Sequence, residues 1–215
     1  MPTETLSEQI LRENAAVFDA MVNHRFVEDI TLGRLPHQVF ERYLVYEGAF
    51  VETAISIFAF ATAKAKTISQ KRWLIDVLDA LANQQVTYFE RIFADRGIDP
   101  GDHNVDAPEV EAFRTGMLDI AQNGGFLDTV AAMFAAEWMY WTWSKSAARS
   151  SIADPHLKEW VDMHADDDFA AQAKWLKQQL DDAGDALDAS ERNRLSAIFG
   201  RAQQLEIAFH DAAYR

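Results

Sequence analysis

Apolar residues recur at helical spacing along almost the whole chain, and this pattern constrains the fold more than any other feature. The 215 residues include only 9 Gly and 5 Pro, which stand between the periodic segments. No alternating run bounded by turn residues predicts a strand. The spacing predicts helices over 4–23, 25–32, 37–64, 68–96, 107–122, 126–150, 155–182 and 188–214. The sequence therefore predicts an all-α fold in a single domain over residues 1–215.

Residues with known preferences at helix ends support these boundaries. Asp154 before Pro155 is typical of an N-cap followed by the first helical residue. Gly97 can end a helix in the left-handed conformation. Asn123, Gly124 and Gly125 predict a short connection between two helices.

Charge and composition exclude several classes of function. The formal net charge is −14, so phosphate backbones and anionic membrane surfaces are repelled, and we expect neither nucleic acid nor membrane as a partner. The absence of cysteine excludes disulfides and thiol nucleophiles. The longest apolar stretch, Ala49–Ala63, is interrupted by Glu52, and no signal peptide is recognisable. We expect a cytoplasmic protein.

Four titratable side chains interrupt apolar helix faces, where the spacing predicts a core. These are Glu47, Glu137, Glu206 and His164. A buried carboxylate must be paired, protonated or placed in a polar pocket, because an isolated buried charge is costly. Aromatic residues stand at corresponding positions of the same or other helices: Tyr43, Phe113, Tyr140 and Phe209. The pattern favours a polar pocket with aromatic walls, which is typical of a small-molecule site.

Each of these residues also has a purely structural interpretation. Glu206 could pair with a core arginine such as Arg42, and Glu137 could lie at a subunit interface. His164 could be a satisfied core or pocket-wall histidine. The acidic run 166–168 is typical of a solvated face.

Two terminal segments resemble the signatures of the TenA family. The N-terminal part contains HRFV at 24–27, GRLP at 33–36 and FERYL at 40–44. The C-terminal part contains EIAFHDAAY at 206–214, and the spacing from GGF at 124–126 to Tyr140 also fits. The resemblance extends over almost the whole chain.

The resemblance implies a haem-oxygenase-like helical bundle that assembles as a homo-oligomer, a dimer or a tetramer. It implies a hydrolase in thiamin salvage whose partner is a small pyrimidine. Aminomethylpyrimidine would become hydroxymethylpyrimidine, or a formyl derivative would become aminomethylpyrimidine. No metal and no organic cofactor is implied.

The resemblance also assigns catalytic roles by position. Glu206 matches the acid–base glutamate of the family, and Tyr140 matches a tyrosine four residues after its nucleophilic cysteine. Ala136 stands at the cysteine position, so the chain resembles the cysteine-less branch, in which a glutamate takes part. Glu137, beside Ala136, is the candidate to activate or position water.

The substrate-binding positions follow in the same way. Glu47 stands where the family has an aspartate that hydrogen-bonds the aminopyrimidine, and Phe209 matches an aromatic residue that packs on the ring. Phe50, Phe113 and His164 occupy positions at which the better-known branch has tyrosines. Tyr43 completes the predicted aromatic wall.

Two other functions are compatible with the sequence. The side chains of Glu47, Glu137, Glu206, His164 and Asp168 are ligand types for non-haem iron, as in a di-iron oxygenase on the same bundle. The paired Glu-x-x-His motif of such bundles is absent from these residues. A non-catalytic pyrimidine-binding or regulatory protein would also explain the missing cysteine.

Overall fold

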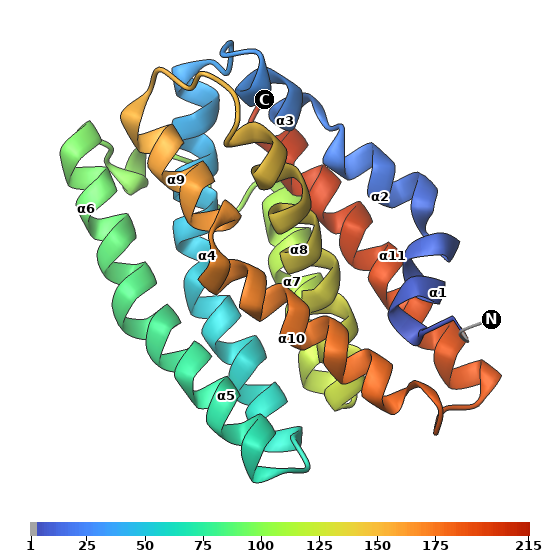
Figure 1. Cartoon of the computed structure of the whole chain (residues 1–215). Coiled ribbons are helices and arrows are strands. Elements are labelled where there is room, and N and C mark those ends of the chain that lie inside the picture. Colours follow the sequence, from blue (N-terminus) through green and yellow to red (C-terminus); the bar gives the residue numbers. More distant parts are fainter. Residues whose placement is uncertain (1–3) are drawn as a thin grey trace. The chain divides into compact units, whose positions relative to one another are not determined.

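A computed structural model describes residues 4–215 and shows an all-α chain, without a strand among those residues (Figure 1). The helices group into two compact units. The first unit contains the residues up to Leu35 together with Val130–Ile207, and the second contains Pro36–Thr129 together with Ala208–Arg215. The expectation of a single domain stays a prediction.

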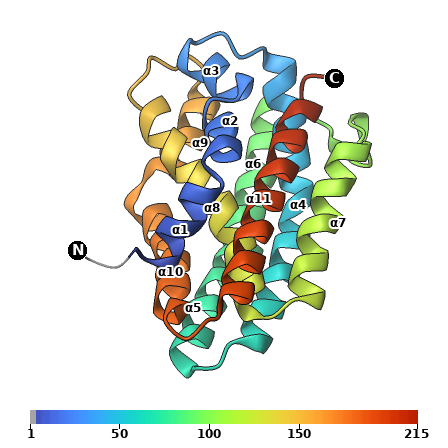
Figure 2. The same cartoon turned by 90° about the vertical axis from the view of Figure 1, so that its right-hand side faces the viewer.

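The first unit is built from short N-terminal helices and the long helices that follow residue 130. Its elements are α1 (Leu6–Glu13), α2 (Ala15–Val22), α3 (Arg25–Thr31), most of α8 (Phe126–Ala147), α9 (Pro155–Ala165), α10 (Asp167–Gly184) and most of α11 (Ala189–Ala212). Helix α1 packs on α10 (Figure 2). The Ser7 N–H donates to Asp181 Oδ1 across this contact, over 2.9 Å.

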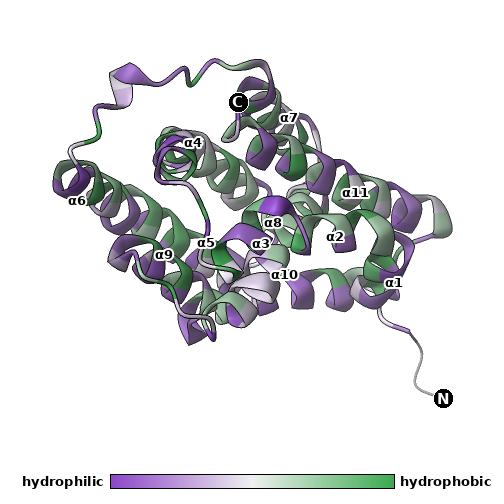
Figure 3. Cartoon of the chain, turned by 90° about the horizontal axis from the view of Figure 1, so that it is seen from above, coloured by the Kyte–Doolittle hydropathy of each residue, from purple (hydrophilic) through white to green (hydrophobic). Residues whose placement is uncertain are grey.

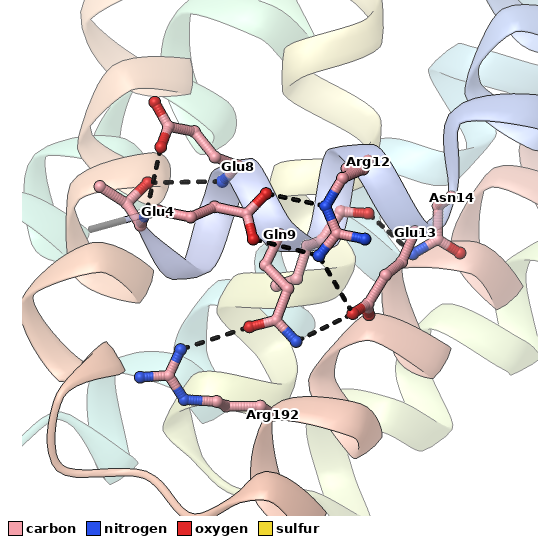
Figure 4. Close-up of polar contacts among 9 residues, drawn as sticks. Glu4, Glu8, Gln9, Arg12, Glu13, Asn14 and Arg192 are labelled. Carbon is pink, nitrogen blue, oxygen red and sulfur yellow. Dashed lines mark hydrogen bonds and ion pairs between the residues drawn. The ribbon is translucent and has the colours of Figure 1, made fainter. Parts of the chain in front are cut away.

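Polar contacts also hold α1 to the beginning of α11 (Figure 4). Arg192 donates to Gln9 Oε1 at 3.3 Å, and Asn14 donates to the Ser196 carbonyl at 3.0 Å. Arg12 pairs with Glu4 at 2.8 Å on the exposed side.

The second unit is organised around one long helix. Its elements are α4 (His37–Lys64), α5 (Ile68–Asp79), the π-helix η1 (Ala80–Gln85), α6 (Val86–Arg96), the 3₁₀-helix η2 (Pro100–Asp102), α7 (Pro108–Asn123) and the last turn of α11. Helices α5, α6 and α7 all pack on α4 (Figure 1). The connection from α6 to α7 is coloured mostly hydrophilic around η2 (Figure 3).

Two predicted helices are each divided in the structure. The helix predicted over 4–23 breaks at Asn14, which leaves helical geometry (φ −107°, ψ 17°) while its side chain donates to the carbonyls of Ile10 and Ser196. The helix predicted over 155–182 breaks at Asp166, which is extended and accepts a hydrogen bond from the Phe169 N–H at 2.8 Å. In both cases a short polar side chain competes with the helix for backbone groups.

The helix predicted over 68–96 is continuous but not uniform. Residues Ala80–Gln85 form a π-helix without a buried side chain, between α5 and α6. The apolar spacing could not predict this π-helix, because the spacing indicates which face of a helix is buried and not which backbone groups are hydrogen-bonded.

The predicted helix ends are largely confirmed. Gly97 ends α6 with a positive φ of 65°, and the Asp154 side chain caps α9 ahead of Pro155. Helix α7 ends at Asn123 and α8 begins at Phe126, as the two glycines between them predict. The carbonyls of Ala121, Gln122 and Gly124 accept hydrogen bonds from Lys64 Nζ at 2.6, 2.9 and 2.6 Å.

Helix α4 also has the length and apolar composition of a membrane span, with a mean hydropathy of 1.5 over its most apolar window. Half of that window is buried inside the protein. Core helices of water-soluble proteins pass the same test, so this helix is weak evidence for a membrane. A cytoplasmic location stays a prediction.

Candidate functional site

The predicted site residues divide between the two units. The predicted catalytic residues and the histidine lie in the first unit: Glu137, Tyr140, His164 and Glu206. The other predicted substrate contacts lie in the second unit: Tyr43, Glu47, Phe50, Phe113 and Phe209.

Glu137 is a buried carboxyl group on α8, with only 9% of its surface exposed. Its Oε1 accepts a hydrogen bond from Gln172 Nε2 of α10 at 3.0 Å. Its Oε2 is buried and has no hydrogen-bond partner among the described residues. Burial raises the pKa of Glu137 from 4.5 to about 7, and the hydrogen bond from Gln172 opposes this rise. The group therefore exchanges its proton near neutral pH.

His164 is buried among aromatic rings at the end of α9. Its Nδ1 lies 2.7 Å from the Trp160 carbonyl oxygen, so this nitrogen carries the proton and donates it. The imidazole contacts Trp160, Tyr140 and Phe169, with ring centroids 4.3, 5.2 and 4.8 Å away. Burial lowers the pKa of His164 from 6.5 to about 4, so the ring is neutral at neutral pH. His164 is thus a buried, hydrogen-bonded histidine, which agrees with its structural interpretation.

Glu206 lies on α11 and is 1% exposed. One turn earlier, Gln203 is fully buried and donates through Nε2 to the Ala135 carbonyl of α8 at 2.6 Å. This bond anchors α11 on α8 three residues before Glu206. The prediction that Glu206 points into the protein is confirmed.

The predicted aromatic residues of the second unit form one cluster. Phe113 of α7 contacts Phe50 and Phe209, with ring centroids 4.6 and 4.7 Å away. Tyr43 meets Phe209 edge-on at 5.8 Å. Tyr43, Phe113 and Phe209 are at most 3% exposed. The structure therefore brings together four of the five residues predicted in this unit.

A cavity of about 190 Å³ opens beside this cluster. It is lined by Tyr46, Ala49, Phe50, Val105, Asp106, Val110, Arg114 and Phe209. An engineered apolar cavity of about 150 Å³ binds benzene, so this volume suits one aromatic ring. Phe50 and Phe209 contribute aromatic side chains to its wall.

Sequence reasoning missed two residues of these sites. Tyr46 is 5% exposed and lines both this cavity and a larger polar one of about 670 Å³. Its position three residues after Tyr43 and four before Phe50 is a helical signal that could have identified it. Gln172 had no comparable signal, because its partner Glu137 lies on another helix.

The remaining candidate residues differ in their surroundings. Glu47 is half-buried, and its role in the pocket stays a prediction. Asp166, Asp167 and Asp168 are exposed, as predicted for a solvated run. Asp168 belongs to α10 and His164 to α9, so these two candidate iron ligands lie on different helices. Across the described residues 4–215, no three His, Asp or Glu side chains gather into a possible metal site.

Comparison with known proteins gives a consistent family match. The sequence pattern of the TENA/THI-4/PQQC family matches residues 13–215. A protein named aminopyrimidine aminohydrolase from Halalkalibacterium halodurans is 29% identical over 203 residues, which cover 92% of this chain and 90% of the relative.

Solved structures show the same fold. A TenA homologue from Pyrococcus furiosus superposes with a TM-score of 0.88 at 21% identity, over 97% of this chain and all of that chain. A domain of unknown function with a heme oxygenase-like fold from Shewanella denitrificans superposes with a TM-score of 0.70 at 14% identity. That match covers 96% of this chain and 90% of the other. The chain therefore has the all-α haem-oxygenase-like fold that the resemblance implies.

Proposed function

Because the chain belongs to the TENA/THI-4/PQQC family, we propose that it hydrolyses a C–N bond of an aminopyrimidine. The substrate would be aminomethylpyrimidine, which releases ammonia, or its formyl derivative, which releases formate. The name of the relative from Halalkalibacterium halodurans supports this reaction class. The relative of the same name from Helicobacter pylori, 22% identical over 96% of this chain, supports it too.

The reaction on aminomethylpyrimidine requires two proton movements. The bond between the methylene carbon and the amine nitrogen breaks, and the amine leaves as ammonia after it takes up a proton. A bond forms between the methylene carbon and a water oxygen, and this water loses a proton. A carboxylic acid can donate the first proton and, as a carboxylate, accept the second.

Glu206 has the acid–base role that its family position implies. Its burial supports a position inside the protein, away from bulk water. Tyr140 would orient Glu206 or the substrate by a hydrogen bond. Both residues lie in the first unit.

Glu137 would replace the missing thiol by positioning or deprotonating water. The observation that carries this proposal is its buried carboxyl group, with a pKa of about 7 and an Oε2 that accepts no hydrogen bond within the described residues. A group that is half ionised at neutral pH is suited to general base catalysis. The sequence predicted that Glu137 is buried, and burial is the main cause of the raised pKa.

The remaining family positions concern the pyrimidine ring. The cluster of Phe50, Phe113 and Phe209 offers flat faces for ring stacking, and Tyr43 packs against it. The role of Glu47 as a hydrogen-bond partner of the ring, and that of His164 as a substrate contact, stay predictions from the resemblance. A homo-oligomeric assembly also stays a prediction.

The test is a kinetic comparison of wild type, Glu206→Gln and Glu137→Gln. Thiamin, aminomethylpyrimidine and formylaminomethylpyrimidine are supplied separately, and ammonia and formate are measured. We expect each variant to lose about two to four orders of magnitude in kcat on the preferred substrate. Glu90→Gln, which changes an exposed glutamate on α6, is the matched control and should retain the wild-type rate.

The outcomes separate the alternatives. Wild-type turnover by Glu206→Gln would refute its acid–base role, and wild-type turnover by Glu137→Gln would refute the replacement of the thiol. Tight binding of aminomethylpyrimidine without any turnover by the wild type would instead favour a non-catalytic binding protein.

A further inference from the structure

The carboxyl group of Glu137 is held asymmetrically. Gln172 Nε2 donates to Oε1 at 3.0 Å, while Oε2 lies buried without a hydrogen-bond partner in the described part of the chain. A carboxyl group with one oxygen bonded in this way cannot rotate freely, because rotation about its terminal bond would break the hydrogen bond. The other oxygen therefore keeps a defined direction.

Gln172 is itself held in place by the helix that carries it. Helix α10 begins after its N-cap residue Asp166. Its buried face includes Ala173 and Leu176, which follow Gln172 by one and four residues. Toward its end the helix is fixed to α1 by the Ser7–Asp181 hydrogen bond. The Gln172 backbone is consequently part of a packed element.

We infer that Gln172 is a positioning residue for Glu137: it holds Oε1 so that Oε2 is the oxygen that faces the reacting water. This inference rests on the proposed role of Glu137. Gln172 does not itself touch the substrate in this scheme, and it acts only through the carboxyl group to which it donates.

The chemistry of the amide suits this role. A glutamine amide keeps its donor at every pH at which the enzyme works, whereas a protonatable partner would change with Glu137. A donor to Oε1 stabilises the ionised carboxylate more than the neutral acid, because hydrogen bonds to charged acceptors are stronger. Gln172 therefore counteracts part of the effect of burial and keeps the pKa of Glu137 close to neutral.

Other titratable groups lie on the helices that contact α8 in this unit. His164 of α9 is neutral above pH 4, so its charge is constant in the working range. Lys174 of α10 and Lys145 of α8 lie over the Trp141 ring, with their Nζ atoms 5.1 and 3.6 Å from its centroid. Glu206 on α11 is another buried carboxyl group of this unit, and its own variant is assayed alongside.

The test is Gln172→Met, which keeps the length of the side chain and removes the donor. The pH profile of kcat is recorded on the aminopyrimidine that the wild type hydrolyses. We expect the acidic limb to move upward by about one pH unit, because the ionised form of Glu137 loses its hydrogen bond. At pH 7 the ionised fraction falls from about a half to about a tenth, so kcat falls about fivefold from this cause alone. Loss of the fixed direction of Oε2 adds to this decrease.

Gln178→Met is the matched control. Gln178 is exposed on the same helix and also donates to a carboxylate, that of Asp182. Its pH profile and kcat should equal those of the wild type. The carboxyl stretch of Glu137, followed by infrared difference spectroscopy between wild type and Glu137→Gln, gives the pKa of Glu137 without reference to turnover.

The failures are distinguishable. If Glu137→Gln is inactive but Gln172→Met keeps both kcat and the pH profile of the wild type, the positioning role is refuted and the proposed function stands. A decrease in kcat without any shift of the acidic limb or of the infrared titration would show a merely structural role and also refutes it. Full activity of Glu137→Gln would refute the proposed role of Glu137 itself.

Discussion

Replacing Glu137 by glutamine should change how the stability of the protein depends on pH. The carboxyl group has a pKa of about 7 in the folded protein and an ordinary value of 4.5. Because the folded pKa is raised, the folded state binds the proton more tightly than the unfolded state. The stabilising contribution of the protonated group is complete below about pH 4.5 and is lost as the pH rises through 7. Glutamine resembles the protonated acid in shape and cannot ionise.

The magnitude follows from the shift in pKa. A displacement from 4.5 to about 7, at 1.36 kcal/mol for each unit, corresponds to roughly 3 kcal/mol. The free energy of unfolding of Glu137→Gln, minus that of the wild type, should therefore rise by about 3 kcal/mol between pH 4.5 and pH 8. The steepest part should approach about 1.4 kcal/mol for each pH unit.

The assay is urea unfolding of both proteins at several pH values, with the free energy extrapolated to water. Taking the difference removes the contributions of the other titratable groups, which both proteins share. Glu90→Gln controls for the loss of one negative charge from an acidic protein. A difference that is independent of pH, or one that grows toward acid pH, would refute the reasoning that burial holds this proton.

Two further predictions concern stability. His164→Gln should remove a pH dependence of stability that has the opposite sign. Burial lowers the pKa of His164 from 6.5 to about 4, so the folded state binds this proton less tightly than the unfolded state. The free energy of unfolding of the wild type should therefore fall by roughly 3 kcal/mol relative to the variant as the pH falls from 6.5 to 4. Paired urea titrations measure this difference, and a constant difference over that range would contradict it. Lys64→Met should lower the free energy of unfolding by about 1–3 kcal/mol, because three backbone carbonyls around the end of α7 lose their donor. The exposed Lys66→Met is the control, and an equal effect of the two substitutions would show that the capping bonds contribute nothing.

The helices could be predicted from the sequence because a helix with one buried face has apolar residues at helical spacing. The breaks at Asn14 and Asp166 could not, since each depends on a polar side chain that takes over backbone groups. Asn14 does so partly through Ser196, which is 182 residues away. Apolar periodicity contains no information about such distant partners.

The site was predictable to a similar degree. The apolar faces identified Glu137, Glu206 and His164 as buried, and all three are. Glu47 was placed in the same class and is half-buried, one turn after the buried Tyr43. Gln172, the partner of Glu137, could not be predicted, because the two residues lie on different helices and are 35 positions apart in the sequence.

Burial shifts the pKa values of Glu137 and His164 in opposite directions. It favours the neutral form of any titratable group, so it raises the pKa of the acid Glu137 and lowers that of the base His164. The first shift brings the titration of Glu137 to neutral pH, and the second removes the titration of His164 from that range. Of these two buried groups, only Glu137 therefore exchanges a proton near neutral pH. The hydrogen bond from Gln172 limits how far burial raises the pKa of Glu137.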